Sequence, residues 1–275
     1  MRSILTVLGV LLLANGYSQY YFNDVIATQQ GNEQYRLLRA AKIKKIKANS
    51  FEADNSATEG FQLEQEISLD GKKITLSSVT SGGRSSVTTR SYELSKLKRT
   101  QTSGGGIENK SEYSYNDKGQ LSKVVLTTTD TAFKYTSVET HEWNYDDAGQ
   151  PVSMLRIKNR LDTTLIDFVK DEKGQVAEER WKKNNHTLQT YYYYYDAGNH
   201  LSDIVRYNSR LKKLIPDFQY EYDAAGRVSQ MTQISLGSAN YIIWKYTYND
   251  KGLKQSEAGF DKEKKLVGRI EYSYE

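Results

Sequence analysis

The sequence contains no cysteine and only two prolines among its 275 residues. Without cysteine there can be no disulfide bond, no thiolate metal site, no cysteine nucleophile and no lipidated cysteine anchor. The three histidines, His141, His186 and His200, stand far apart, and no metalloprotease, nucleophile-elbow or Walker-type motif occurs. The sequence therefore predicts a protein that is not an enzyme, with no catalytic residues, no metal site and no cofactor.

Neither positive nor negative charge is in large excess. Lys and Arg number 38 and Asp and Glu 34, which gives a net charge of +4. A charge this small over this length indicates no dedicated polyanion partner such as a nucleic acid. Hydrophobic residues make up only 37%, yet aromatic residues reach 12%, with 22 Tyr against 7 Phe. So many aromatic residues exclude a disordered chain and favour a β protein with a polar surface and an aromatic core.

Long apolar runs are missing apart from one near the N-terminus. The run from Ile4 to Ala14 follows Arg2 and precedes the small residues Gly16 and Ser18. This is the pattern of a secretory signal peptide, predicted here as residues 1–18, and it is too short to span a bilayer. We expect export to the periplasm or the cell surface of a Gram-negative bacterium, with no transmembrane segment in the mature chain.

A repeated segment dominates the rest of the chain. Six copies begin with alternating aromatic residues and end in glycine: Tyr113–Gly119, Trp143–Gly149, Phe168–Gly174, Tyr193–Gly198, Tyr220–Gly226 and Tyr246–Gly252. The alternation of aromatic and polar residues is typical of a half-buried strand. An Asp or Asn followed three residues later by Gly predicts a type I turn closed by a glycine with positive φ. We therefore predict turn roles for Gly119, Gly149, Gly174, Gly198, Gly226 and Gly252.

Each repeat of about 26 residues then contains two strands and two turns. Residues 19–41 have helical character, with Tyr35, Leu38 and Ala41 spaced at i, i+3 and i+6, and residues 42–275 form the repeat domain. The predicted fold is all-β. It is a long antiparallel meander of about eighteen short strands, preceded by a short helix and curled into an open barrel or partial shell with its aromatic face inside.

The repeat resembles the YD repeat of RHS proteins, teneurins and related insecticidal toxin components. Residues 222–228, with Tyr222, Asp223 and Gly226 at the spacing of that motif, carry the likeness most clearly. It covers roughly residues 92–275. In large members of the family many such hairpins form a hollow shell around a toxic domain. This chain has far fewer repeats, so the resemblance implies a short exported member of the family.

One copy breaks the polar pattern of the outward face. If Asn184 and Asn185 form a two-residue hairpin turn, Lys183 faces His186 and one further pair is Trp181 with Leu188. That register places four residues together on the outer surface: Trp181, Leu188, Tyr192 and Tyr194. Exposed aromatic residues mark binding sites, and flat rings suit sugars or a protein partner. Two alternatives stay open. The N-terminal helix covers the strip, or a bulge flips the register.

Three functional hypotheses remain. The first is a non-enzymatic exported binding or envelope-scaffold protein that recognises surface glycan or another envelope protein. The second is a truncated relative of a toxin-encapsulating shell. The third is an outer-membrane β-barrel, against which the polar residues on both strand faces count.

Overall fold

The computed structural model describes residues 20–208, 211–234 and 240–275, so the predicted signal peptide lies outside the described residues. The described residues form one helix, α1 (Asn23–Ala40), and eighteen strands. The first nine strands are β1 (Lys45–Glu52), β2 (Gln62–Ile67), β3 (Lys73–Val79), β4 (Ser85–Glu93), β5 (Lys96–Gly104), β6 (Ile107–Tyr115), β7 (Leu121–Asp130), β8 (Tyr135–Tyr145) and β9 (Pro151–Lys158). The other nine are β10 (Asp162–Lys170), β11 (Val176–Lys183), β12 (His186–Tyr195), β13 (Leu201–Asn208), β14 (Lys213–Tyr222), β15 (Val228–Ile234), β16 (Tyr241–Tyr248), β17 (Lys254–Phe260) and β18 (Leu266–Tyr274).

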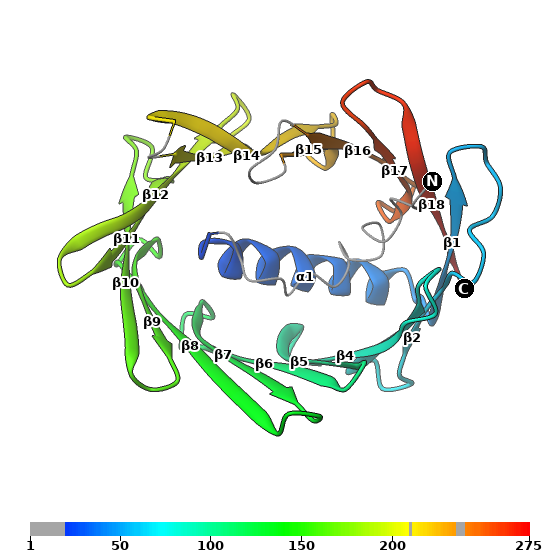
Figure 1. The fold of residues 1–275 in the computed structure, drawn as a ribbon, viewed down its shortest axis with the longest axis horizontal. Coiled ribbons are helices and arrows are strands. Elements are labelled where there is room, and N and C mark those ends of the chain that lie inside the picture. The colour runs from blue at the N-terminus through cyan, green and yellow to red at the C-terminus, as the bar shows by residue number, and fades with distance from the viewer. Residues whose placement is uncertain (1–19, 209–210, 235–239) are drawn as a thin grey trace.

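The sheet is a closed antiparallel barrel (Figure 1). Every strand pairs with the next one in the sequence, which confirms the predicted meander. The sheet goes beyond the predicted open barrel or partial shell because β1 also pairs with β18, with Ile46 opposite Tyr274. Closure removes the exposed sheet edges, which would otherwise pair with other chains.

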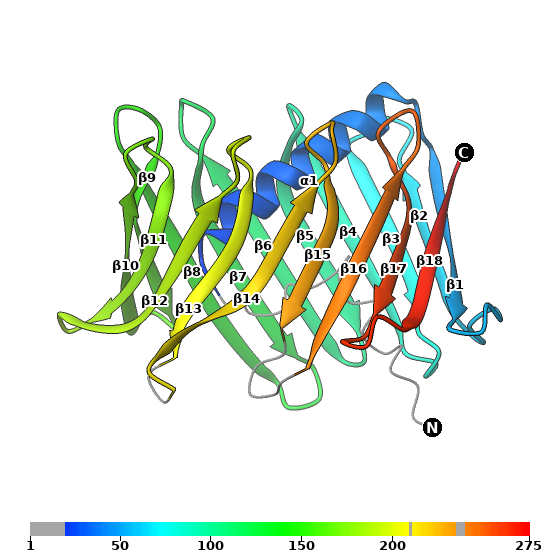
Figure 2. The same ribbon diagram turned by 90° about the horizontal axis from the view of Figure 1, so that it is seen from above.

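The repeated turns all lie at one end of the barrel. In the turn between β14 and β15, the amide of Gly226 donates to the carbonyl oxygen of Asp223. The carboxylate of Asp223 accepts hydrogen bonds from the amides of Ala225 and Arg227. We call this end the turn rim. We call the opposite end, where connections such as residues 131–134 and 159–161 lie, the tip rim. Figure 2 shows the two ends from the side.

Five of the six predicted turn glycines have positive φ, and the prediction for Gly198 is wrong. The confirmed set is Gly119, Gly149, Gly174, Gly226 and Gly252. In the remaining copy Asn199 has φ 64° and its amide makes the turn hydrogen bond to Asp196. Gly198 stands one position too early because only one residue separates it from Asp196, whereas two residues separate the Asp or Asn from the Gly in the other copies. Asparagine tolerates the left-handed conformation, so the turn keeps its geometry.

Replacing a turn glycine tests this geometry. We expect Gly226→Val to lower the free energy of unfolding by about 1–3 kcal/mol, because a β-branched residue is strained at the φ of 73° that Gly226 adopts. Gly82→Val is the matched control, since Gly82 lies in a loop without positive φ and a Cβ there meets only Thr80 Oγ1 at 3.9 Å. Thermal unfolding of both variants checks the prediction. Equal losses of Tm would contradict it.

The helix lies inside the barrel, along its wider dimension (Figure 1). Tyr21 and Val25 are buried at its N-terminal end, and Tyr35 and Leu38 at its C-terminal end. The Tyr35 ring stacks on Tyr92 of β4 at 3.9 Å between ring centroids. The helix predicted over residues 19–41 is therefore confirmed in type and close to its predicted bounds, and it fills part of the interior.

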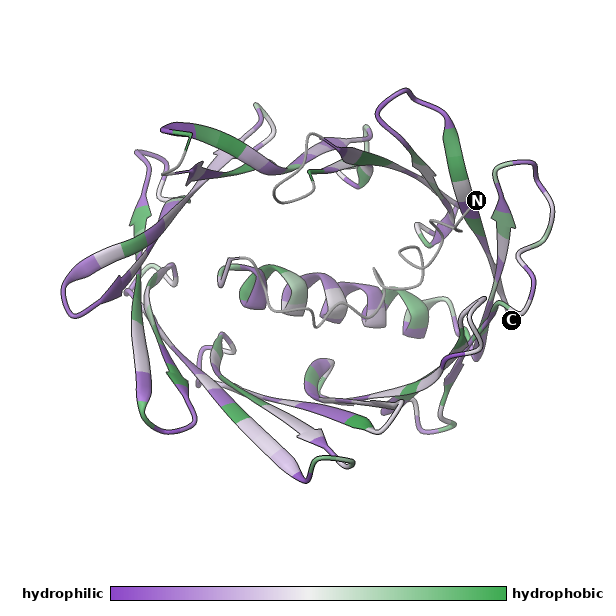
Figure 3. Cartoon of the chain, in the orientation of Figure 1, coloured by the Kyte–Doolittle hydropathy of each residue, from purple (hydrophilic) through white to green (hydrophobic). Residues whose placement is uncertain are grey.

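The inward faces of the strands supply the core. Residues buried with the start of the helix form one cluster on the β7–β13 side, and residues buried with its end form another on the β1–β5 side. A third cluster around Trp244 lies between β15, β16, β18 and β1–β3. Figure 3 shows how hydrophobic and hydrophilic residues mix along the strands. The predicted aromatic interior is confirmed, for example by Trp143, which is 5% exposed.

Candidate functional site

Neighbouring repeats separate from each other as they approach the turn rim. After the turn that joins β10 to β11, Lys170 pairs with Val176 and Val169 with Glu178, so Ala177 forms a bulge without a partner. On its other side, β11 pairs with β12 only from Glu178 onward. The first residues of β11 therefore bend toward β10, and a gap opens between β11 and β12.

Tyrosine hydroxyl groups bridge these gaps around the turn rim. The second aromatic residue of a motif donates to a carbonyl oxygen at the start of the preceding repeat's second strand. The six pairs are Tyr115 with Leu97, Tyr145 with Leu121, Tyr195 with Val176, Tyr222 with Leu201, Tyr248 with Val228 and Tyr274 with Lys254. Burial raises the pKa of Tyr195, which keeps its hydroxyl group protonated as a donor. This recurring hydrogen bond explains why the repeats use tyrosine rather than phenylalanine at this position.

The gap between β11 and β12 is widened into a cleft of about 300 Å³ on the barrel wall. Its lining combines residues of the preceding turn with residues at the ends of both strands: Asp171, Lys173, Gln175, Ala177, Glu178 and Tyr192–Tyr195. Two features make room for it. The first is Ala177, whose side chain at the bulge is only a methyl group. The second is the pair Tyr192 and Tyr194, whose large side chains line the cleft at positions where other repeats carry residues such as Ser114 or Glu142.

Polar groups converge on the same cleft. Gln175 Nε2 donates to the carbonyl oxygen of Asn199 at 3.3 Å, whereas Gln175 Oε1 is buried and has no hydrogen-bond partner among the described residues. Glu178 is held by Arg180, with Arg180 Nε 2.7 Å from Glu178 Oε2. Lys173 Nζ lies 3.4 Å from Asn199 Oδ1. The cleft thus offers ring faces, a buried acceptor, a carboxylate and an ammonium group, which are the groups that bind hydroxyl-rich ligands.

The structure separates the four residues of the predicted strip. Tyr192 and Tyr194 lie on the outer face and line the cleft, in agreement with the prediction, and Tyr194 is 46% exposed. Leu188 is also exposed, at 57%, but it lies toward the tip rim, at the other end of β12. The cleft therefore unites two of the four predicted residues.

The predicted outward position of Trp181 is wrong. Trp181 lies on the inner face, where its ring packs against Tyr21 at 4.8 Å between centroids and its Nε1 donates to Glu179. The two-residue turn is confirmed, since Lys183 pairs with His186. Beyond it Leu188 forms a bulge without a partner, so Trp181 pairs with a residue one position further along β12. This single extra residue reverses the face, as the alternative of a flipped register foresaw.

Several cleft residues were not predicted from the sequence. Gln175, Glu178 and Lys173 belong to a turn and a bulge whose geometry depends on both neighbouring strands. One signal was present: the run of five tyrosines, Tyr191–Tyr195, occurs nowhere else in the sequence, and the preceding repeat has the small residue Ala177 after its turn.

Behind the cleft, a buried carboxylate anchors the start of the helix. Glu179 is fully buried, and it accepts hydrogen bonds from the amides of Tyr21 and Phe22, from Trp181 Nε1 and from the Tyr193 hydroxyl group. Burial raises the pKa of Glu179, and these four donors oppose the rise by stabilising its charged form. Tyr193 links the two sites, because it also lines the cleft.

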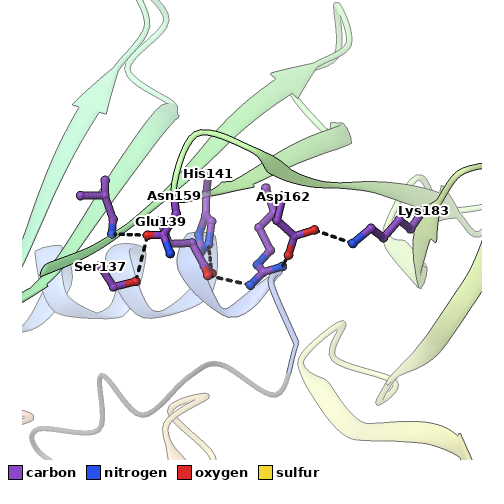
Figure 4. A network of polar contacts seen from close by, with 8 residues as sticks. Ser137, Glu139, His141, Asn159, Asp162 and Lys183 are labelled. Atoms are coloured by element: carbon purple, nitrogen blue, oxygen red, sulfur yellow. Dashed lines mark hydrogen bonds and ion pairs between the residues drawn. The ribbon is translucent and has the colours of Figure 1, made fainter. Parts of the chain in front are cut away.

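A second polar network runs from His141 and Glu139 of β8 to Asp162 and Lys183 (Figure 4), and His141 also joins it to Asp24 of the helix. His141 is 2% exposed and lies between Asp24, at 2.6 Å, and Glu139, at 3.0 Å. Arg156 donates to Glu139 and also contacts Asp162, which in turn pairs with Lys183. Burial favours the neutral form of His141, but the two carboxylates outweigh it and raise its pKa to about 9. The imidazole is therefore a cation at neutral pH.

Neither a metal site nor a spanning helix is present in the part of the chain that the structure describes. No group of three or more metal-ligating side chains gathers there. Within the same ranges, no helix has the length and apolar character needed to cross a bilayer.

The chain matches no protein-family model and no curated protein. A porin-like protein from Bacteroides uniformis is similar over 85% of this chain and 98% of its own length, with 11% identity and a TM-score of 0.39. A porin-like protein from Bacteroides vulgatus gives 10% identity and a TM-score of 0.28. The Tc holotoxin pore of Photorhabdus luminescens gives 13% identity and a TM-score of 0.31, over 86% of this chain and 17% of that one. These likenesses identify no function for this chain.

Proposed function

We propose that this chain is a non-enzymatic binding protein of the bacterial envelope, a short relative of the YD-repeat proteins, and that its outer cleft between β11 and β12 recognises glycan. The observation that carries the proposal is the pair Tyr192 and Tyr194 beside the unpaired acceptor Gln175 Oε1. Aromatic faces stack on the apolar faces of sugar rings, while a buried carbonyl oxygen accepts from a sugar hydroxyl group. A cleft of about 300 Å³ suits one or two sugar units.

The interior supports an outward binding role over a toxin-encapsulating one. The barrel contains its own helix, anchored at one end through Glu179 and stacked at the other on Tyr92. A shell that encloses cargo needs that volume for another domain. The closed ring and the occupied interior favour recognition at the outer wall.

The outer wall also favours aqueous surroundings. Ion pairs run along it between neighbouring strands, for example Lys123 with Glu142 and Arg99 with Glu112, each at 2.8 Å. A Lys or Arg that faces lipid at the bilayer midplane costs about 2–4 kcal/mol. The wall chemistry therefore supports an exported protein at the envelope rather than an outer-membrane barrel.

The double variant Tyr192→Ala/Tyr194→Ala tests the cleft. We expect it to lose at least about tenfold in affinity for the oligosaccharides that the unchanged protein binds on a glycan array, because stacking supplies about 1 kcal/mol or more per ring. Both tyrosines face outward, so Tm should stay within a few degrees. Calorimetric titration with the best array ligand measures the affinity.

Tyr135→Ala/Tyr207→Ala is the matched control. Tyr135 and Tyr207 are 55% and 44% exposed but lie toward the tip rim, so their removal should leave glycan affinity unchanged. A protein that binds no glycan, or that loses affinity equally in both double variants, would refute the cleft as the glycan site.

A further inference from the structure

The two rims of the barrel differ in their exposed side chains. On the arc from β5 to β14, the tip rim exposes large apolar side chains on successive hairpins: Ile107, Phe133, Tyr135, Leu161, Leu188 and Leu211. Phe133 is 84% exposed and Leu161 89%. On the turn rim of the described residues the exposed large apolar or aromatic side chains are Leu69, Leu94, Val152 and the cleft residue Tyr194, and they do not form an unbroken row on successive connections. Single exposed apolar side chains are common on protein surfaces, but a row of them on consecutive hairpin tips indicates an interaction surface.

The tips are also basic, whereas the turns are acidic. Four tip segments, residues 130–135, 158–162, 182–187 and 211–214, hold seven Lys and Arg against two Asp, a net charge of +5. The six repeated turns, residues 116–120, 146–150, 171–175, 196–200, 223–227 and 249–253, hold four Lys and Arg against eight Asp and Glu, a net charge of −4. Some tip cations pair within the protein, such as Lys183 with Asp162, but the excess stays positive. The barrel is therefore polarised from one end to the other.

Backbone geometry holds each apolar side chain beside a basic one at the point of a hairpin. Lys134, Arg160 and Lys212 have positive φ, as expected in the tight turns at these tips. Each directly neighbours an exposed apolar residue: Phe133, Leu161 and Leu211. Since the tips belong to adjacent hairpins of one closed sheet, the pairs form a row along one end of the barrel (Figure 2).

We propose that the tip rim between β5 and β14 docks on the surface of an anionic lipid bilayer. Apolar side chains on the tips enter the boundary between headgroups and acyl chains, and the neighbouring Lys and Arg side chains contact anionic headgroups. A protein partner would need to match a curved row of separate points, whereas a fluid lipid surface adapts to them. The barrel then stands on the membrane with its acidic turn rim facing the solvent.

Vesicle sedimentation tests the proposal with the purified protein. We expect binding to vesicles of phosphatidylcholine with about one third phosphatidylglycerol, weaker binding to phosphatidylcholine alone, and loss of binding as salt screens the charges. Phe133→Ser/Leu161→Ser and Lys134→Glu/Arg160→Glu should each weaken binding to the anionic vesicles by about tenfold or more. Leu69→Ser/Leu94→Ser is the control, because Leu69 and Leu94 are fully exposed on the turn rim, and it should bind as the unchanged protein does.

Three outcomes would overturn the proposal. The first is no binding to anionic vesicles. The second is binding lost in the charge variant but retained in the Phe133→Ser/Leu161→Ser variant, which would show attraction to any polyanion rather than insertion into lipid. The third is concentration-dependent self-association that the Phe133→Ser/Leu161→Ser variant abolishes, without vesicle binding, which would make the rim a contact between copies. None of these variants touches the cleft, so glycan binding is measured independently.

Discussion

Glu179→Leu should lower the free energy of unfolding by about 3–5 kcal/mol, a large effect for a single substitution. The carboxylate of Glu179 serves four donors at 2.5–2.9 Å, two of which are the backbone amides of Tyr21 and Phe22. Each donor left without an acceptor in the interior costs about 1–3 kcal/mol. Relief from burying a charge offsets several kcal/mol of that sum, so the net loss stays below the sum of the four.

The adjacent Glu178 provides the control. It points outward, is partly exposed and, among the described residues, forms an ion pair with Arg180 alone, so Glu178→Leu should change stability by no more than about 1 kcal/mol. Urea unfolding of both variants measures the difference. Hydrogen exchange over residues 20–40 shows whether the helix leaves the barrel before the barrel unfolds. Similar small losses in the two variants would show that Glu179 does not anchor the helix.

The periodicity of the repeats explains why so much of the fold was predictable. Alternating aromatic residues, an Asp or Asn and a Gly are local signals, and the structure confirms the strands, the turns and the inward aromatic face that they predict. Closure was not predictable, because it depends on β1 meeting β18 at the far end of the sequence, with Glu52 opposite Gly268 and Ile46 opposite Tyr274. Nor was the interior position of the helix, which depends on Glu179 accepting from its first amides.

In the candidate site too, features set within one strand were predictable, and features that depend on the pairing of two strands were not. The outward position of Tyr192 and Tyr194 follows from alternation within one strand, and it was predicted correctly. The position of Trp181 depends on the pairing of two strands, and one unpaired residue, Leu188, was enough to reverse it. The cleft needs both the bulge at Ala177 and the end of the β11–β12 pairing, so no single strand could reveal it.

The buried His141 predicts a pH dependence of stability on the alkaline side. Its pKa is about 9 in the folded protein and about 6.5 in an unfolded chain, so folding holds its proton more tightly. The resulting stabilisation is fully present below about pH 6.5 and is lost as the pH rises through 9. A difference of this size corresponds to about 3 kcal/mol. Because Asp24 belongs to the helix and His141 to β8, the loss loosens the contact between helix and wall.

The variant His141→Gln isolates this contribution. At pH 6 it should be less stable than the unchanged protein by about 3 kcal/mol, since Asp24 loses its cationic partner and Glu139 keeps only Arg156, and the difference should shrink toward pH 9 as the native histidine itself becomes neutral. His186→Gln is the control, because His186 is exposed on a hairpin tip, and its stability should follow the unchanged protein at every pH. Urea unfolding between pH 6 and 9 gives the three curves. A loss in His141→Gln that stays constant across this range would show that shape, rather than the charge on the imidazole, holds the helix in place.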